Sequence, residues 1–141
     1  MYNEVIADDD VYSQSFEPNK IEKKNLDIKK LRILLNKLGF RPVNLGTKYI
    51  IESVTYCFEN DIFGINRIDE AYKHTAKKYN VRPDTILWDI QKAVNLMNVY
   101  ANRELLHEIF YWCDKKEHIP TKTFMDSFLN YLIENEKEYK K

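Results

Sequence analysis

The sequence predicts an all-α fold of about six helices built around a helix-turn-helix. From Leu26 to the end of the chain, apolar residues recur every three or four positions, which is the spacing of a buried helical face. Strand-like alternation of useful length does not occur in the sequence. The stretch AKKYNVRPDTI, from Ala76 to Ile86, has the spacing of two crossing helices joined by a short turn. These observations place a helix-turn-helix at the centre of the fold.

The turn of this motif has residues suited to its geometry. Ala76 is small enough to let two helices cross closely, and Ile86, ten positions later, anchors the second helix. Asn80 tolerates a positive φ, and Pro83 suits the first turn of a helix, where no N–H is needed. The same turn also joins helices that only pack together. DNA binding and simple packing are therefore equally supported by this segment alone.

The periodicity predicts six helices in order. The first follows Leu26 and stops at Gly39, the second covers 46–58, and the third starts near Asn66 as its cap. The fourth starts at Pro83, the fifth is capped by Asn102, and the sixth opens at 120–121. The residues expected to face the core are Leu31, Leu34, Leu35, Leu38, Ile50, Val54, Cys57, Phe58, Ile68, Tyr72, Ala76, Tyr79, Ile86, Ile90, Val94, Met97, Leu105, Leu106, Ile109, Cys113, Phe124, Phe128, Tyr131 and Leu132.

Composition and charge favour one domain preceded by an acidic N-terminal segment. The chain has 141 residues, 44% of them hydrophobic, which suits a single core. Its 22 basic and 22 acidic residues balance, so the overall positive charge common among nucleic-acid binders is missing. Residues 1–22 hold six acids and one lysine, a net of −5, which leaves +5 for 23–141. We therefore expect a flexible acidic segment over 1–24 and a helical domain over 25–141; an acidic arm that mimics nucleic acid is the alternative for the segment.

Three further features bear on location, on cysteine chemistry and on charge. No apolar run approaches the roughly 20 residues that span a bilayer, and the N-terminus does not resemble a signal peptide, so we expect a cytoplasmic protein without membrane contact. Cys57 and Cys113 lie among apolar residues and are expected to be buried reduced thiols. The segment 23–41 holds seven basic residues against Asp27, either as a solvated helix face or as a phosphate-binding surface.

Several motifs occur in an order that matches one known family. KYNVRPDTI lies within TAKKYN…AVNLMN, preceded by LGTKYIIESV and followed by NRELLHEIF and PTKTFMDSFLNYL. Over roughly residues 25–135 they resemble the C-terminal effector-domain family of the sporulation response regulator, stage zero sporulation protein A. The most specific parts are the AKKYN core, the pair Gly46 and Tyr49, and the helix start at 120–121. By this resemblance, 67–79 is the supporting helix and 83–97 is the recognition helix that enters the major groove.

The resemblance implies a DNA-binding transcriptional regulator of sporulation type, with double-stranded DNA as its partner. RNA polymerase or another regulator would be protein partners, and a homodimer would be the form on DNA. The family carries a phosphorylatable receiver domain of over a hundred residues ahead of the effector. Only about 25 residues precede the matching region here. We therefore expect a stand-alone effector domain that no receiver of its own controls.

The expected recognition helix departs from the family in its outward residues. Where the family presents arginines and a glutamate, this sequence has Thr85, Leu87, Trp88 and Gln91. A bidentate arginine discriminates guanine by about 1–3 kcal/mol, so the family's DNA preference is not expected to transfer. Gln91 is expected to read adenine, and Thr85 and Trp88 to face the DNA. The residues expected to hold the phosphate backbone are Arg82, Lys92 and Lys48.

A second interpretation is that the motif has been turned from DNA to protein. Asp84 and Asp89 flank the recognition surface and would repel phosphate. An exposed pair of Leu87 and Trp88 is costly unless covered, and tryptophan is favoured at the centre of interfaces. The partner would then be a regulator or an RNA polymerase subunit. A third reading is that Leu87 and Trp88 pack against the N-terminal segment or a neighbouring helix.

Catalytic and metal-binding signatures are weak. His74, His107 and His118 do not form a hydrolase or metal pattern. The three glycines lie at 39, 46 and 64, too far apart for a phosphate-binding loop. We therefore expect no enzymatic activity, no cofactor and no metal.

Overall fold

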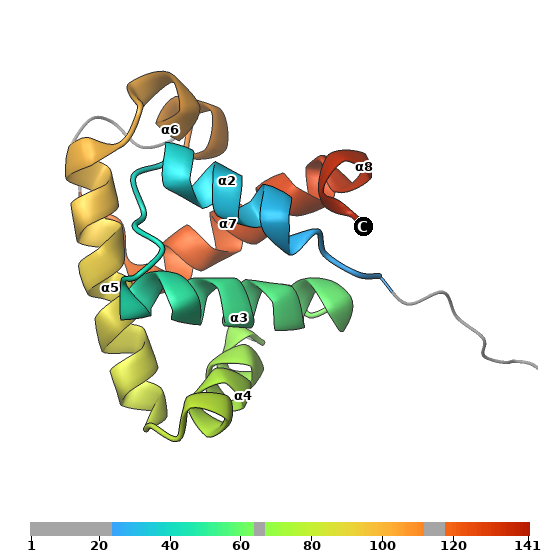
Figure 1. The fold of residues 1–141 in the computed structure, drawn as a ribbon, viewed down its shortest axis with the longest axis vertical. Helices are drawn as coiled ribbons and strands as arrows, with labels where there is room; N and C mark the ends of the chain where they lie inside the picture. The colour runs from blue at the N-terminus through green and yellow to red at the C-terminus, as the bar shows by residue number, and fades with distance from the viewer. Residues whose placement is uncertain (1–23, 64–66, 112–117) are drawn as a thin grey trace, which may run out of the picture.

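The computed structural model describes residues 24–63, 67–111 and 118–141, and these residues form seven helices and no strand. In the order of the chain the helices are α2 (Ile28–Lys37), α3 (Leu45–Glu59), α4 (Ile68–Tyr79), α5 (Pro83–Tyr100), α6 (Arg103–Ile109), α7 (Thr121–Glu134) and α8 (Glu136–Tyr139). Figure 1 shows α5 along one side of the molecule, with α4 and α6 near its opposite ends. The helices α2, α3 and α7 extend away from it and form the body of the domain.

The first helix begins and ends where the sequence predicts. Asp27 is its cap, since its carboxylate accepts a hydrogen bond from the N–H of Lys30 at 3.2 Å. Gly39 follows the helix with a φ of +97°, a left-handed conformation that glycine adopts without a steric penalty. The leucines expected to face the core are all buried: Leu31, Leu34, Leu35 and Leu38.

Helix α3 lies at the centre and contacts both helices of the helix-turn-helix. Against α4 it forms a buried hydrogen bond of 2.7 Å between the hydroxyls of Ser53 and Thr75. Against α5 the approach is close, because α3 has Gly46 at the crossing. A Cβ at Gly46 would lie 2.8 Å from the Cβ of Ala93 and would overlap the backbone carbonyl oxygen of Asp89. Only glycine therefore permits this spacing of α3 and α5.

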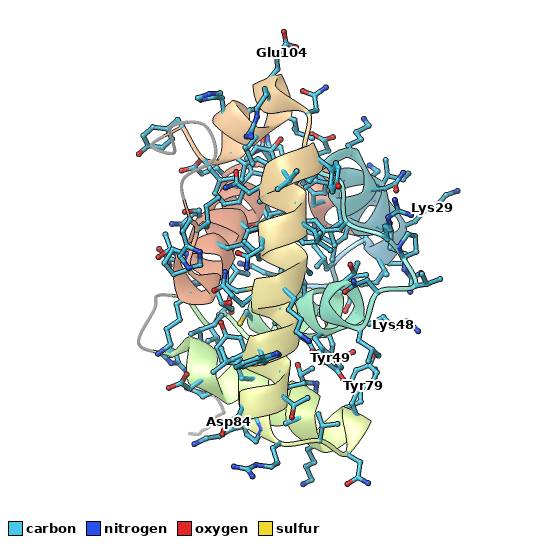
Figure 2. The ribbon with its side chains drawn as sticks, turned by 90° about the vertical axis from the view of Figure 1, so that its left-hand side faces the viewer. Lys29, Lys48, Tyr49, Tyr79, Asp84 and Glu104 are labelled. Atoms are coloured by element: carbon cyan, nitrogen blue, oxygen red, sulfur yellow. The ribbon has the colours of Figure 1, made fainter. Side chains whose placement is uncertain are left out.

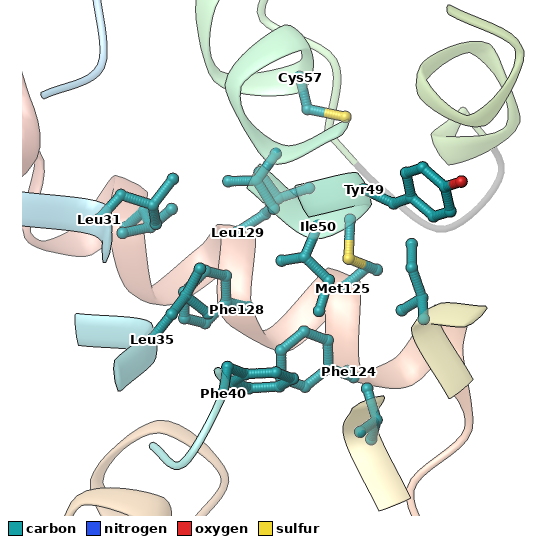
Figure 3. Close-up of a cluster of buried hydrophobic side chains, with 14 of the residues drawn as sticks. Leu31, Leu35, Phe40, Tyr49, Ile50, Cys57, Phe124, Met125, Phe128 and Leu129 are labelled. Carbon is teal, nitrogen blue, oxygen red and sulfur yellow. The ribbon is translucent and has the colours of Figure 1, made fainter. Parts of the chain in front are cut away.

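The core lies where α3 and α7 meet the first helix and the loop that follows it (Figure 3). The ring centroid of Phe124 lies 5.5, 5.3 and 5.4 Å from the ring centroids of Phe40, Phe110 and Phe128, respectively. All four rings are buried. The cluster joins α7 to the loop after α2 and to the end of α6, so it ties elements distant in sequence into one core.

The two ends of the described chain are joined. The N–H of Asp27 donates to the carbonyl of Tyr139 at 2.7 Å, and the N–H of Lys141 donates to that of Asn25 at 2.7 Å. The ammonium of Lys24 lies 3.0 Å from the carboxylate of Asp61. The two backbone bonds fix the segment before α2 against α8, and the ion pair fixes it against the turn after α3, so the helical domain closes on itself.

The predicted all-α fold is confirmed, and most of the expected elements are present. Every residue predicted to face the core is buried or half-buried in the described part of the chain; Cys113 lies outside it. Asn66 also lies outside, and the residue at the start of α4 is Arg67, whose side chain makes no capping hydrogen bond. The sequence did not predict α8. The proposed flexible segment over 1–24 and the nucleic-acid mimic lie outside the described residues, except for Lys24, which is half-buried.

Candidate nucleic-acid interface

The turn between α4 and α5 has the geometry that the sequence predicts. Asn80 has a φ of 55° and a ψ of 48°, the left-handed conformation that asparagine tolerates. The N–H of Val81 then donates to the carbonyl of Ala76 at 3.0 Å, which closes the end of α4. Pro83 is the first residue of α5. Ala76 is buried, as a close crossing of the two helices requires.

Aromatic contact holds the end of α4 against α3. The rings of Tyr49 and Tyr79 meet edge to face, with centroids 5.0 Å apart. Burial, with the nearby charge of Asp89 as a smaller cause, raises the pKa of Tyr49 above its ordinary value. Tyr49 therefore remains a neutral packing group, and the turn is fixed by α3 as well as by its own hydrogen bonds.

The outer face of α5 lies open along its length. In Figure 2 this helix stands in front of the others, and no other described helix crosses it. Trp88 is 68% exposed, and the ammonium of Lys92 lies 5.9 Å from its ring centroid, within the range of a cation–π contact. Thr85 is half-buried beside them. Helix α5 thus presents a mixed apolar and basic surface to solvent.

Basic residues flank α5, and its two aspartates are each close to a cation. The guanidinium of Arg82 lies 3.2 Å from the carboxylate of Asp84, and both side chains are exposed. The ammonium of Lys92 lies 4.0 Å from Asp89. Lys48 lies on the flank of α5 in Figure 2, with an exposed side chain and no ion pair in the described residues. The two aspartates therefore weaken the positive potential near Arg82 and Lys92, but the charge of Lys48 is not compensated by an ion pair in the described residues.

Gln91 has a structural role that the sequence did not indicate. Its amide oxygen accepts hydrogen bonds from the backbone N–H and the hydroxyl of Thr121, at 2.8 and 2.9 Å. Its amide nitrogen donates to the carbonyl of Ile119 at 2.9 Å and to Asn95 at 3.0 Å. Gln91 thus caps the start of α7 from α5. The residue at the N-cap position of α7 is Pro120, which has no side chain able to make this bond. Reading adenine would require these bonds to break.

Leu87 and Trp88, which are adjacent in α5, differ in their exposure to solvent. Leu87 is half-buried and packs against the core, whereas Trp88 projects into solvent. Packing against the fold is therefore confirmed for Leu87. None of the described helices covers Trp88, and its packing against the N-terminal segment lies outside the described residues. Further along α5 the exposed apolar side chains continue with Leu96, Val99 and Tyr100.

A carboxylate joins α3 to α4 through a lysine and a histidine. Glu52 lies 2.7 Å from the ammonium of Lys78 and 2.7 Å from the Nε2 atom of His74. The ring of His74 also stacks on that of Tyr56, with centroids 4.1 Å apart. Burial alone would raise the pKa of Glu52, but the hydrogen bonds from Lys78 and His74 outweigh it and the pKa lies below its ordinary value. The i, i+4 spacing of His74 and Lys78 was visible in the sequence; their shared partner was not.

The lowered pKa of Glu52 makes the stability of the domain depend on pH. A carboxylate with a depressed folded-state pKa stabilises the fold above its ordinary pKa of 4.5 and loses this contribution as the pH falls through the folded value. We expect Glu52→Gln to lower the melting temperature most above pH 5, with the difference shrinking at pH values below 4.5. Thermal melts across this range test it. Glu134→Gln, at an exposed position, is the control, and an equal effect of both variants at all pH values would contradict the assignment.

A metal-binding arrangement is not found in the described residues. His, Cys, Asp and Glu side chains do not gather there in groups of three that could hold a metal ion. Burial raises the pKa of the Cys57 thiol to about 12, so Cys57 is an unreactive buried thiol, as predicted. His107 and His118 are both exposed. None of the described helices has the length and apolar character needed to cross a membrane.

The comparison with protein families shows which family the chain belongs to. A family model described as sporulation initiation factor Spo0A C terminal matches residues 31–133 of the 141. The chain belongs to this family. The match confirms the predicted resemblance. Spo0A C-terminal domains are DNA-binding regulatory domains rather than enzymes. No curated protein and no solved structure matches the chain.

Proposed function

We propose that this Spo0A-type domain is a transcriptional regulator that inserts α5 into the major groove of duplex DNA. The observation that supports it most strongly is the helix-turn-helix geometry, with a left-handed Asn80 between α4 and an α5 whose outer face is open. A helix of this kind is narrow enough to enter the groove while its neighbour crosses the backbone. A cytoplasmic location is part of the same proposal.

The proposed contacts follow the exposed face of α5. Arg82, Lys92 and Lys48 are exposed cations at its start, on its face and on its flank, and they bind phosphates in this proposal. Thr85 and Trp88 face the bases. Gln91 is left out of the base-reading set because its amide already caps α7. Without arginines at the base-reading positions, a thymine methyl is the natural partner of Thr85.

Two substitutions test this proposal. Lys92→Ala is expected to weaken binding to all duplexes alike and to reduce the slope of log affinity against log salt by about one unit, because one phosphate contact is lost. Trp88→Ala is expected to change the preference among sequences selected by the wild type. Fluorescence anisotropy across a salt series measures both.

The matched control is Lys137→Ala, an exposed lysine on α8 without an ion pair in the described residues. Helix α8, which contains Lys137, lies on the side of the molecule away from α5 (Figure 1). We expect its salt slope to equal that of the wild type. A wild-type protein that binds selected duplexes no better than random ones at moderate salt would refute the proposal.

A second candidate function is a protein-interaction module that binds a regulator or an RNA polymerase subunit. It is favoured by the exposed apolar side chains along α5, which include Trp88 and Tyr100, the latter 74% exposed. In that case Trp88→Ala should weaken partner binding by about 2 kcal/mol or more, while Lys92→Ala should have little effect. Capture from the native cell with and without nuclease distinguishes a protein partner from one tethered by DNA. Sedimentation with and without duplex would test the homodimer.

A further inference from the structure

A groove opens between α2, α3 and α4. Its volume is about 370 Å³, within the range of small-molecule sites. The groove has an apolar wall that includes Leu35, Phe40 and Ile51. Leu35 and Phe40 are core residues, so this wall is rigid and continuous with the packed interior.

The rim of the groove has an excess of positive charge. Arg32, Lys48 and Lys78 line it together with one carboxylate, that of Glu52. Glu52 is already bound by Lys78 and His74 at 2.7 Å each. The side chains of Arg32 and Lys48 have no ion pair or hydrogen bond within the described residues. Two cationic side chains from different helices thus line the same groove without an anionic partner of their own.

The groove also has an unsatisfied polar group. Thr47 lines it, is 2% exposed, and has a hydroxyl oxygen with no hydrogen-bond partner in the described part of the chain. Most buried hydroxyls in folded proteins have a partner. A polar atom of a molecule in the groove would supply one after rotation of the threonine side chain.

We propose that this groove binds a small organic anion, with its apolar body against Phe40 and Ile51 and its phosphate or carboxylate between Arg32 and Lys48. A DNA backbone would use the cations but not the apolar wall, whereas an apolar molecule without charge would leave both cations unpaired. The combination of wall and charge selects a ligand that has both parts. Arginine is suited to either headgroup, because its fork of donors matches phosphate and carboxylate oxygens alike.

The binding test uses the full chain and phenyl phosphate as the probe, followed by NMR of the backbone amides. We expect saturable shifts centred on residues 47–52 and 78–79, with phenol and inorganic phosphate each binding at least tenfold more weakly. Phenylacetate in place of phenyl phosphate distinguishes a carboxylate site from a phosphate site. Arg32→Gln should weaken phenyl phosphate binding at least fivefold, while Lys29→Gln, on the same helix but outside the groove, should not change it.

Three outcomes would overturn the site: shifts that do not saturate, shifts spread over all basic surfaces, or equal weakening by Arg32→Gln and Lys29→Gln. The spectrum of each variant also shows whether it is folded. Lys48→Gln provides a second variant from a different helix, and it too should weaken phenyl phosphate binding.

Occupancy of the groove would also engage Lys48, a proposed phosphate contact, so the ligand should weaken duplex binding; this consequence rests on the proposed function. Anisotropy at constant ionic strength should show at least a threefold loss of duplex affinity with phenyl phosphate at a concentration that saturates the wild type, and a smaller loss for Arg32→Gln at the same concentration. If the wild type binds no duplex, the proposed function fails while the NMR titration still decides the site. If duplex affinity is unchanged at saturation, the competition is refuted.

Discussion

Replacing Phe124 with alanine is expected to lower the free energy of unfolding by about 3–5 kcal/mol, the usual cost of deleting a buried aromatic ring. Phe124 is fully buried and its ring contacts three other phenylalanines at centroid separations of 5.3–5.5 Å. These rings come from α7, from the loop after α2 and from the end of α6. The cavity would therefore open at a junction of three elements, where no single side chain can fill it.

Chemical denaturation followed by circular dichroism measures this loss. Tyr111→Ala is the matched control, because Tyr111 is also aromatic but is 81% exposed. Its effect is expected to stay within about 0.5 kcal/mol, as at other surface sites. A Phe124→Ala variant as stable as the control would mean that the aromatic cluster does not hold α6 and α7 together.

The sequence predicted those parts of the fold that depend on local chemistry. The left-handed turn at Asn80, the helix start at Pro83 and the cap at Asn102 each follow from the conformational preference of one residue. The buried faces of the longer helices follow from the spacing of their apolar residues. These features were predictable because each is decided within a few positions of the chain.

The remaining features depend on how the helices dock. Gln91 looked like an outward residue of the recognition helix, but the start of α7 lies against it and takes its amide as a cap. Glu52 meets Lys78 and His74 only because α3 and α4 pack side by side. The groove between α2, α3 and α4 likewise exists only in the folded chain. Side chains paired across helices cannot be identified from spacing within one helix.

Replacing Gly46 with alanine is expected to separate α3 from α5 and so to impair both stability and DNA binding. In an open helix this change would stabilise by up to about 1 kcal/mol, because alanine is the better helix former. Here the added methyl group would overlap the carbonyl oxygen of Asp89 and lie 2.8 Å from the Cβ of Ala93. A backbone atom cannot move aside as a flexible side chain can. The overpacking cost, about 1–3 kcal/mol or more, should therefore outweigh the gain in helix propensity.

The position of α5 makes this substitution informative about function. Movement of α3 would displace Lys48 from the flank of α5, and the tilt of α5 relative to the Tyr49–Tyr79 contact would change. Thermal melting and duplex binding should therefore both decline, whereas Leu45→Ala, at the adjacent and 52% exposed position, should leave both nearly unchanged. A Gly46→Ala variant with wild-type melting and wild-type duplex affinity would show that α3 and α5 do not meet at this glycine.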